Sequence, residues 1–411
     1  MQLTLMRWID RYAGSVLCFL LTVIYKTFRT AGFFSKPGTR PKQGVLMIEL
    51  SEMGSAILAY PLIAEIQNKY PSAPVYFLTF ARNKDAVQIL NVFPDGHILT
   101  IRDTGFGEFL IDTLKFIFRV RKLSVATTID LELFSRFTAI LTFLSGAEKR
   151  IGFYKFRMEG LYRGDFLTHK IPYSPQHHIS KIFLSFLQNI DKDEHIQPTM
   201  SESAWAGNGP LPPKIVSSEN AARNIMKKLK KLNQSFCEGS RLFIMNPSAG
   251  PLLPIRAWPI EHYIELSNDI LKAPNHFIAI IGLDDAAGAA RKIIEESIDK
   301  ARCINLVNQT SLVELIDLFN VAEALITNDS GPAHFATLTS IKTFVFFGPE
   351  TPVLYSPLGD NIHIQYAHFP CSPCLTGFNH RNSPCLDNRC LKAIKPGEVY
   401  QRIQKLCFKG A

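Results

Sequence analysis

Residues 324–338 have the sequence ALITNDSGPAHFATL, which predicts a buried strand, a polar turn and then a helix. Pro332 lacks an N–H and therefore suits the first turn of that helix. The unpaired N–H groups of a helix start favour an anion such as a diphosphate, and His334 would lie one turn further along. Capping of the helix by Asp329 or Ser330 is an equally good interpretation of the local sequence.

A second polar segment follows a predicted strand at residues 246–263, which read NPSAGPLLPIRAWPIEHY. Arg256 precedes the helix that begins after Trp258 and Pro259. An arginine here could bind a phosphate with two parallel hydrogen bonds, or it could stack on Trp258 at the surface.

A third segment, IIGLDDAAG at residues 280–288, places Gly282, Asp284 and Asp285 at a strand end. A carboxylate there could accept hydrogen bonds from ribose hydroxyls. Capping of the next helix explains the aspartates equally well.

Strands and helices alternate along two stretches of the chain, which predicts two open α/β sheets with parallel strands. Ligands of such sheets bind beyond the carboxyl ends of the strands. The predicted strands are 44–50, 75–80, 97–101 and 124–131, then 241–246, 276–282, 303–307, 324–327 and 343–348. The predicted helices lie between the loop 51–55 and Tyr70, near 82–91, near 107–122, and at 260–272, 285–299, 311–320 and 331–339, with a capping box from Ser311 to Glu314.

The length of 411 residues also favours two domains. We expect a membrane-associated helix and connector at 1–43, a first Rossmann-like domain at 44–205, a linker at 206–239, a second at 240–395 and a C-terminal helix at 396–411. The Pro-rich stretch 172–239 is expected to join the sheets. Its basic run 227–231, KKLKK, fits a solvated helix face better than a phosphate-rich partner.

The composition is that of a globular protein, with 46% hydrophobic and 20% charged residues, which excludes collagen-like and disordered classes. A net charge of +9 suits an anionic partner. The positive residues are dispersed and no recognition module occurs, so we expect no nucleic-acid partner. Neither GxGxxG nor GxxxxGK[ST] is present, which weakens dinucleotide-oxidoreductase and P-loop interpretations.

The N-terminal run YAGSVLCFLLTVIY, residues 12–25, is apolar and has basic flanks. Its fourteen residues are fewer than the roughly 20 of a bilayer span, and extension to Phe34 would bury Lys26 and Arg29. An interfacial helix on anionic lipids, a buried helix, a true span and a signal peptide stay open, and we favour the interfacial helix.

The eight cysteines fall into two groups. Four are scattered and are expected to be buried and apolar, which fits a reducing, cytoplasmic setting. The other four could hold a structural zinc ion, with loop thiols free of metal as the favoured interpretation. The scattered group is Cys18, Cys237, Cys303 and Cys407, and the crowded group is Cys371, Cys374, Cys385 and Cys390.

From about Val45 to Leu391 the chain resembles glycosyltransferase family 9, the ADP-heptose:lipopolysaccharide heptosyltransferases. The resemblance is carried most specifically by NDSGPAH and CSPC. It is also carried by VLMIELSEMGSAILAYPLI, EKRIGF, NPSAG with RAWPIEHY, and VFFGPETPVLYSPLG. It implies a GT-B architecture, in which two Rossmann-like domains face each other across a cleft and the second holds a nucleotide sugar.

The resemblance also implies which residues hold the donor. Asp329, Ser330, Gly331 and His334 match the phosphate-binding turn, and Arg256 matches the family's basic residue before Trp-Pro. No metal is generally required in that mechanism. From their place at a strand end, and not from the resemblance, Asp284 or Asp285 is expected to contact the nucleoside.

The first loop departs from the family pattern. Members commonly carry Met-Gly-Asp with the aspartate as general base, whereas this chain has Ser55 after Met53 and Gly54. A serine has no useful basicity at neutral pH, so Glu52 or Glu49 is the candidate replacement.

The implied function is an inverting transfer of a heptose-like sugar to a lipopolysaccharide-core or other lipid-linked acceptor at the cytoplasmic face of the inner membrane. The alternative is a non-catalytic protein with the same fold that binds a nucleotide sugar or glycolipid and has lost its general base.

Overall fold

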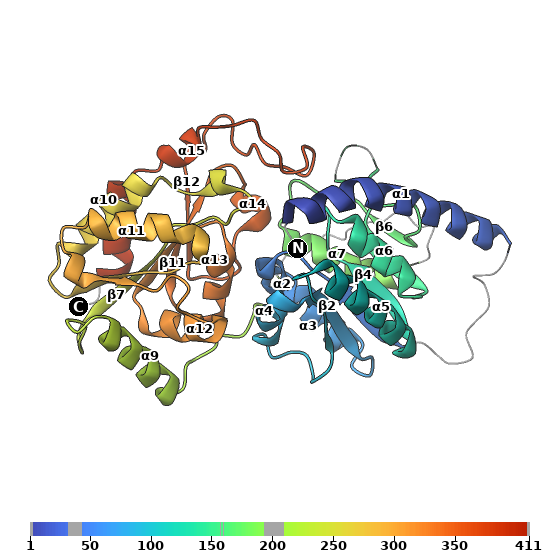
Figure 1. Ribbon diagram of the computed structural model, residues 1–411, viewed down its shortest axis with the longest axis horizontal. Coiled ribbons are helices and arrows are strands. Elements are labelled where there is room, and N and C mark those ends of the chain that lie inside the picture. The colour runs from blue at the N-terminus through green and yellow to red at the C-terminus, as the bar shows by residue number, and fades with distance from the viewer. Residues whose placement is uncertain (1–2, 32–42, 157, 159, 193–208, 409–411) are drawn as a thin grey trace. The chain divides into compact units, whose positions relative to one another are not determined.

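The computed structural model describes residues 3–31, 43–156, 158, 160–192 and 209–408, which divide into two compact units (Figure 1). The first unit contains the described residues up to Leu211 together with Thr376–Arg381. The second contains Pro212–Leu375 and the described residues from Asn382 onward. The domain limits given above stay a prediction, and residues 193–208 of the expected joining region lie outside the described residues.

The first unit is built on six parallel strands in the order β3-β2-β1-β4-β5-β6. The strands are β1 (Gly44–Ile48), β2 (Val75–Phe80), β3 (Ile98–Ile101), β4 (Val125–Asp130), β5 (Lys149–Phe153) and β6 (His169–Ile171). The helices are α1 (Leu3–Thr30), α2 (Met53–Leu58), α3 (Tyr60–Lys69), α4 (Lys84–Gln88), α5 (Phe106–Lys122), α6 (Arg136–Leu144) and α7 (Ile179–Ile190).

The second unit repeats the plan with six parallel strands in the order β12-β11-β10-β7-β8-β9. The strands are β7 (Arg241–Asn246), β8 (His276–Ile280), β9 (Cys303–Asn305), β10 (Ala324–Asn328), β11 (Lys342–Phe347) and β12 (Ile362–Tyr366). The helices are α9 (Glu219–Leu232), α10 (Ile260–Leu271), α11 (Ala287–Glu295), α12 (Leu312–Val321), α13 (Gly331–Phe335), α14 (Pro352–Tyr355), α15 (Arg389–Lys392) and α16 (Pro396–Ile403).

Both sheets have the doubly wound strand order, so the prediction of two parallel α/β sheets is confirmed. In each sheet the first strand of the unit pairs with the second on one side and the fourth on the other. The strand order therefore reverses between β1 and β4, and between β7 and β10. Such a switch point leaves a crevice at the carboxyl ends of the two strands, because their connections leave in opposite directions.

The core of the second unit is fixed by aromatic side chains next to its switch point. Trp258 is 2% exposed and stacks on Phe346, with ring centroids 4.1 Å apart. Tyr263 is buried and its hydroxyl donates to the carbonyl of Asn246 at 3.0 Å. The alternative that Arg256 stacks on Trp258 at the surface is therefore wrong, since the indole face is already occupied inside the core.

Several predicted elements differ in detail. The segment 51–55 is not wholly a loop, because α2 begins at Met53 and Ser55 lies inside it. The predicted helix 331–339 is a five-residue α-helix followed by a 3-10 turn at Ala336–Leu338. The capping box of Ser311 and Glu314 is confirmed. The joining stretch contains α7, which packs on α3, and α9, which packs on α12.

An ion pair lies wholly inside the first unit. Arg163 donates to the carboxylate of Asp130 at the end of β4 and to Thr138 Oγ1 at 2.9 Å. The side chains are 3% and 0% exposed. Burial raises the pKa of Asp130, and the Arg163 guanidinium opposes that shift. Removal of one partner leaves the other charge buried without compensation.

We predict that Arg163→Met lowers the free energy of unfolding by about 3–5 kcal/mol at neutral pH, as measured by urea denaturation with circular dichroism. The control is Arg102→Met, which removes a half-exposed arginine paired with Asp112 and should cost about 1 kcal/mol or less. Equal losses in the two variants would contradict the role given to the buried pair.

Candidate functional sites at the two switch points

In the second unit, hydrogen bonds join the ends of β7 and β10. Asn246, the last residue of β7, donates through Nδ2 to Thr327 Oγ1 at 3.0 Å and to Ser330 Oγ at 2.9 Å. Asn328 accepts from the backbone N–H of Trp258 at 2.8 Å. The turn after β10 is thus held against the loop after β7, so two segments about eighty residues apart form one surface.

Arg256 is the charged group at this surface. Its Nη1 donates to Asp329 Oδ2 at 3.1 Å and its Nη2 to the carbonyl of Ala249 at 3.2 Å. The side chains of Arg256 and Asp329 are 16% and 7% exposed. The buried Nε of Arg256 has no hydrogen-bond partner among the described residues. A charged N–H group held in place with a free hydrogen suits an anionic ligand.

Asp329 makes a contact that the local sequence did not suggest. Its carboxylate bonds Arg256, so it holds the arginine instead of capping a helix. Ser330 is the N-cap residue of α13, but its side chain makes no capping bond, so capping by either side chain is wrong. Because α13 has only five residues, its dipole is small. His334 is buried in α13.

The aspartates after β8 stand at the surface. Gly282 has φ +149°, and a Cβ there would lie 2.3 Å from that of Ala286, so only glycine fits this turn. After Gly282 the chain forms a short 3-10 helix at Asp284–Ala286, and no side chain caps this helix. Asp284 accepts from Asn308 Nδ2 at 2.6 Å and Asp285 accepts from Ser248 Oγ. The capping interpretation is therefore wrong for both.

In the first unit, carboxylates gather at the ends of β1 and β4. Glu132 Oε1 accepts from the N–H groups of Leu50 and Ser51, each at 2.9 Å, and from Ser51 Oγ at 2.7 Å. Burial raises the pKa of Glu132 to about 6 against the lowering effect of these bonds. Burial together with Glu132 raises the pKa of Glu49 well above its ordinary value.

Glu52 is the accessible carboxylate of this group. It is the N-cap residue of α2, its side chain is 50% exposed, and its Oε1 accepts from Arg381 Nη1 at 2.6 Å. Ser55 lies one turn later, and its N–H donates to the carbonyl of Glu52 at 3.1 Å. Glu49 is 5% exposed, which leaves it poorly placed to reach an external substrate. Of the two carboxylates that could replace the missing aspartate, only Glu52 is open to solvent.

The cysteines divide differently from the expectation. Cys18 and Cys407 are buried, Cys303 is half-buried and Cys237 is exposed, so the prediction of burial is wrong for Cys237. In the crowded group Cys390 is buried and Cys371 is exposed. Within the described residues, no three His, Cys, Asp or Glu side chains are arranged to hold a metal ion.

Sequence reasoning missed the residues that hold the site together. Asn246 ends a predicted strand and lies in the quoted NPSAG motif, so its position was a usable signal. Arg381 gave none, since it lies 329 positions from Glu52. Glu132 follows the predicted strand 124–131 directly, and its carboxylate at a strand end could have been included.

The raised pKa of Glu132 predicts a pH-dependent stability. A carboxyl with a higher pKa in the folded state than in the unfolded state adds stability that is complete below about pH 4.5 and is lost as the pH rises through about 6. We expect wild type to lose about 2 kcal/mol more than Glu132→Gln between pH 4.5 and 7.5 in urea denaturation.

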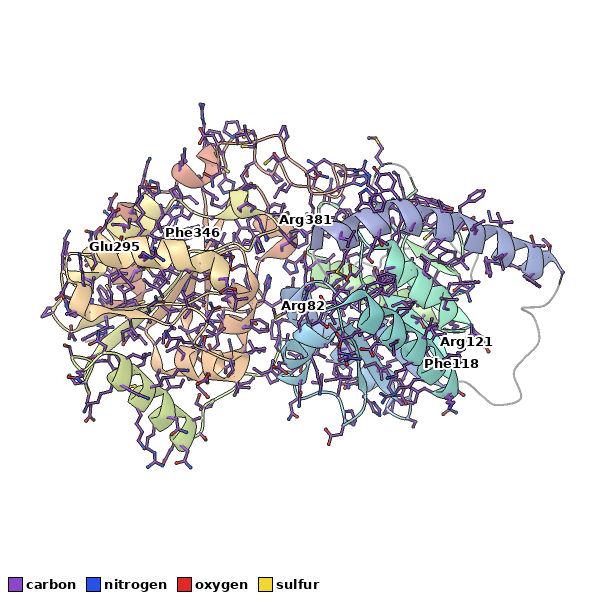
Figure 2. All side chains as sticks on the ribbon, viewed as in Figure 1. Arg82, Phe118, Arg121, Glu295, Phe346 and Arg381 are labelled. Carbon is purple, nitrogen blue, oxygen red and sulfur yellow. The ribbon has the colours of Figure 1, made fainter. Side chains whose placement is uncertain are left out.

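The control is Glu295→Gln, at an exposed position on α11 of the second unit (Figure 2), which should track wild type. A Glu132→Gln profile parallel to wild type would contradict a protonated Glu132 in the folded state at acidic pH.

The model of glycosyltransferase family 9 (heptosyltransferase) matches residues 135–382, more than half of the chain. Among curated proteins, the lipooligosaccharide heptosyltransferase 2 of Campylobacter jejuni is 28% identical over 173 residues, which is 41% of this chain and 52% of that protein. The lipopolysaccharide heptosyltransferase 2 of Salmonella typhimurium is 27% identical over 27% of this chain and 32% of its own length. The matched part of the chain thus spans about half the length of these relatives or less.

Two solved structures are similar over most of the chain. The Escherichia coli ADP-heptose lipopolysaccharide heptosyltransferase II has a TM-score of 0.68 at 18% identity and covers 89% of this chain and 99% of its own. A family 9 glycosyltransferase from Veillonella parvula has a TM-score of 0.67 at 15% identity and covers 90% and 98%. These likenesses show the fold, in agreement with two Rossmann-like units of the GT-B type. With its fold and the match over residues 135–382, the chain belongs to glycosyltransferase family 9, the heptosyltransferase family.

Proposed function

We propose that this protein transfers a heptose-like sugar, with inversion, from a nucleoside diphosphate to a lipopolysaccharide-core or other lipid-linked acceptor at the cytoplasmic face of the inner membrane. Family membership supports the reaction class. The single observation that carries the donor site is Arg256, whose side chain is 16% exposed and held by Asp329, and whose Nε–H has no partner among the described residues at the switch point of the second sheet. Several relatives are named heptosyltransferases, which favours a heptose over other sugars.

In the proposed donor site, Arg256 binds the diphosphate and Asp329 is a positioning residue for it. Ser330 Oγ, Gly331 and His334 of the adjoining turn complete the phosphate contacts, while Asp284 or Asp285 binds the ribose hydroxyls. Since Arg256 is already charged, it stabilises the negative charge that grows on the leaving diphosphate as the sugar–phosphate bond breaks.

In the proposed chemical step, the acceptor hydroxyl attacks the anomeric carbon from the face opposite the diphosphate, which inverts the configuration. Glu52 takes the hydroxyl proton as the new carbon–oxygen bond forms, and the diphosphate leaves with the electron pair of the broken bond. Arg381 positions Glu52 through the contact between Nη1 and Oε1. No metal takes part in this proposal.

A non-catalytic binding protein is the second candidate. It is favoured by one observation: Ser55 stands in α2 where members of the family commonly carry an aspartate, and Glu52 is already engaged by Arg381. The two candidates differ in whether the nucleotide sugar is consumed.

The donor site predicts a selective loss of nucleotide affinity. We expect Arg256→Ala to raise the Kd for the preferred nucleoside diphosphate about 10–100-fold, because a hydrogen-bonded charge on the phosphates is lost. Isothermal titration with ADP, UDP and GDP identifies that nucleotide and measures the change, and CMP serves as a monophosphate for comparison.

Arg291→Ala, at an exposed position on α11 of the same unit, is the matched control and should bind as wild type does. If Arg256→Ala also binds with wild-type affinity, the diphosphate does not lie at the switch point of the second sheet.

The assignment of Glu52 predicts a loss of turnover without a loss of binding. Glu52→Gln should lower kcat about 10²–10⁴-fold, because the amide cannot accept the acceptor's proton, and should leave nucleotide affinity unchanged. Release of the nucleoside diphosphate in the presence of acceptor is the measurement.

Ser55→Ala is the control and should retain most of the turnover, since the hydroxyl supplies no base. Undiminished turnover by Glu52→Gln would refute this assignment, and a strong loss in Ser55→Ala would move the catalytic role to the serine.

A further inference from the structure

The N-terminal helix α1 lies along α6 of the first unit (Figure 1). Its buried residues recur every three or four positions at Gly14, Cys18, Thr22 and Tyr25, and Asp10, one turn before them, is half-buried. A Cβ on Gly14 would lie 3.1 Å from Cβ of Arg136, so the two helices approach closely. One stripe of α1 is therefore committed to the body of the protein.

Polar contacts fix both ends of that stripe. Asp10 Oδ1 accepts from the N–H groups of Arg136 and Phe137, each at 2.9 Å, at the start of α6. Thr22 Oγ1 accepts from the N–H of Asp165 at 2.8 Å, and Lys26 pairs with the same aspartate at 2.6 Å. These anchors are 16 residues apart, about 24 Å of helix. If a helix bound to its own domain over that length crossed a bilayer, part of the domain would have to enter the bilayer with it.

The opposite face of α1 is apolar and open. By length and composition alone, the helix could span a membrane. Only 22% of its most apolar stretch is buried in the protein. Scattered exposed apolar residues are ordinary, but a continuous set on one helix marks an interaction surface. The exposed large side chains are Leu5, Trp8, Tyr12, Val16, Leu17, Phe19, Leu20, Val23, Ile24 and Phe28.

A second apolar stripe runs along α5. Phe106, Leu110, Leu114 and Phe118 stand four residues apart and are 47–68% exposed. Figure 2 marks Phe118 towards the C-terminal end of this helix. The opposite face of α5 packs on the sheet through Phe116 and Val120. The exposed stripe therefore adds nothing to the core of the unit.

The two stripes belong to one side of the first unit. The connections β3 to β4 and β4 to β5 both run in the same direction along the sheet, so right-handed crossovers place α5 and α6 on the same face. Phe109 of α5 packs on Phe137 of α6 with ring centroids 4.8 Å apart. Met6 of α1 packs against the same cluster. Helix α6 thus lies between two helices with exposed apolar faces.

The charges beside these stripes are basic. The acidic residues of the two helices are Asp10, Glu108 and Asp112, and each is paired with an arginine of the unit, Arg136 or Arg102. Lys26 of α1 is already paired with Asp165. The other basic residues at exposed positions are Arg7, Arg11 and Arg29 on α1 and Lys115, Arg119, Arg121 and Lys122 on α5. Against a second copy of the chain these like charges would repel, whereas anionic headgroups attract them.

We propose that α1 and α5 together form a two-helix surface that docks the first unit on an anionic phospholipid bilayer, with α1 lying in the plane of the interface. The apolar stripes enter the acyl boundary and the lysines and arginines meet the phosphates. The proposal of a membrane as the partner rests in part on the proposed function, because an enzyme docked on a bilayer can reach a lipid-linked acceptor.

The test is flotation of the full chain with vesicles of phosphatidylcholine alone or mixed with phosphatidylglycerol. We expect binding to the anionic vesicles, weaker binding in high salt, and release by alkaline carbonate. The double variant Leu114→Glu with Phe118→Glu should bind at least about 100-fold more weakly, because two large apolar side chains no longer enter the lipid.

The matched control is Leu232→Glu with Val313→Glu, two exposed apolar positions of the second unit, which should bind as wild type does. Thermal melts and nucleotide titrations of all variants should agree with wild type, so a failure of docking is distinguished from a failure of the donor site.

Three results would overturn the proposal. Wild-type flotation by the α5 variant would exclude α5 from the surface. Resistance to carbonate would show that α1 spans the bilayer. A lipid-free dimer that the α5 variant converts to a monomer would show that a second copy covers the stripes.

Discussion

Parallel strands whose helices cross in opposite directions leave a crevice at one place in the sheet, and both units of this protein depend on that constraint. In the second unit the crevice brings Asn246 at the end of β7 next to the turn after β10. In the first it brings the loop after β1 next to Glu132 after β4. The chemistry-bearing residues are therefore assembled by sheet topology from segments that are distant in the sequence.

The ion pair between Arg256 and Asp329 holds a guanidinium in a mostly buried position at the switch point. A guanidinium without a counter-ion in a mostly buried position would be strongly unfavourable, so the carboxylate allows it to be held there. The pair leaves Nε of the arginine without a partner among the described residues. In the proposed donor site, an incoming phosphate accepts its hydrogen. Asn246 and Asn328 join the two loops on either side of the pair.

Long buried strands and amphipathic helices could be predicted because each has a hydrophobic pattern that is contained within a few consecutive residues. Strand β7 was predicted with its observed limits, and α5 within one residue. The strands β5, β6 and β12 were not predicted. His169–Ile171 is three residues long, and Ile362–Tyr366 alternates apolar and polar side chains at a sheet edge, so neither has the apolar run of a central strand.

The residue types of the candidate site could be predicted, but their partners could not. Asp329 was placed with the phosphate-binding turn, and its bond to Arg256 follows only from the fold, since 73 positions separate them. Glu52 was identified as a substitute for the missing aspartate, whereas its contact with Arg381 depends on a distant segment returning to the first unit. Pairings of this kind are set by tertiary structure and leave no local pattern.

The most direct test of the account is a transfer assay with purified protein, a nucleotide sugar and a truncated lipopolysaccharide core. The mass of the acceptor and the amount of released nucleoside diphosphate are measured together, with ADP-heptose as the first donor. We predict that the acceptor gains one sugar for each diphosphate released. Tight binding of the nucleotide sugar with no change in the acceptor and no release of diphosphate would contradict it and identify a binding protein.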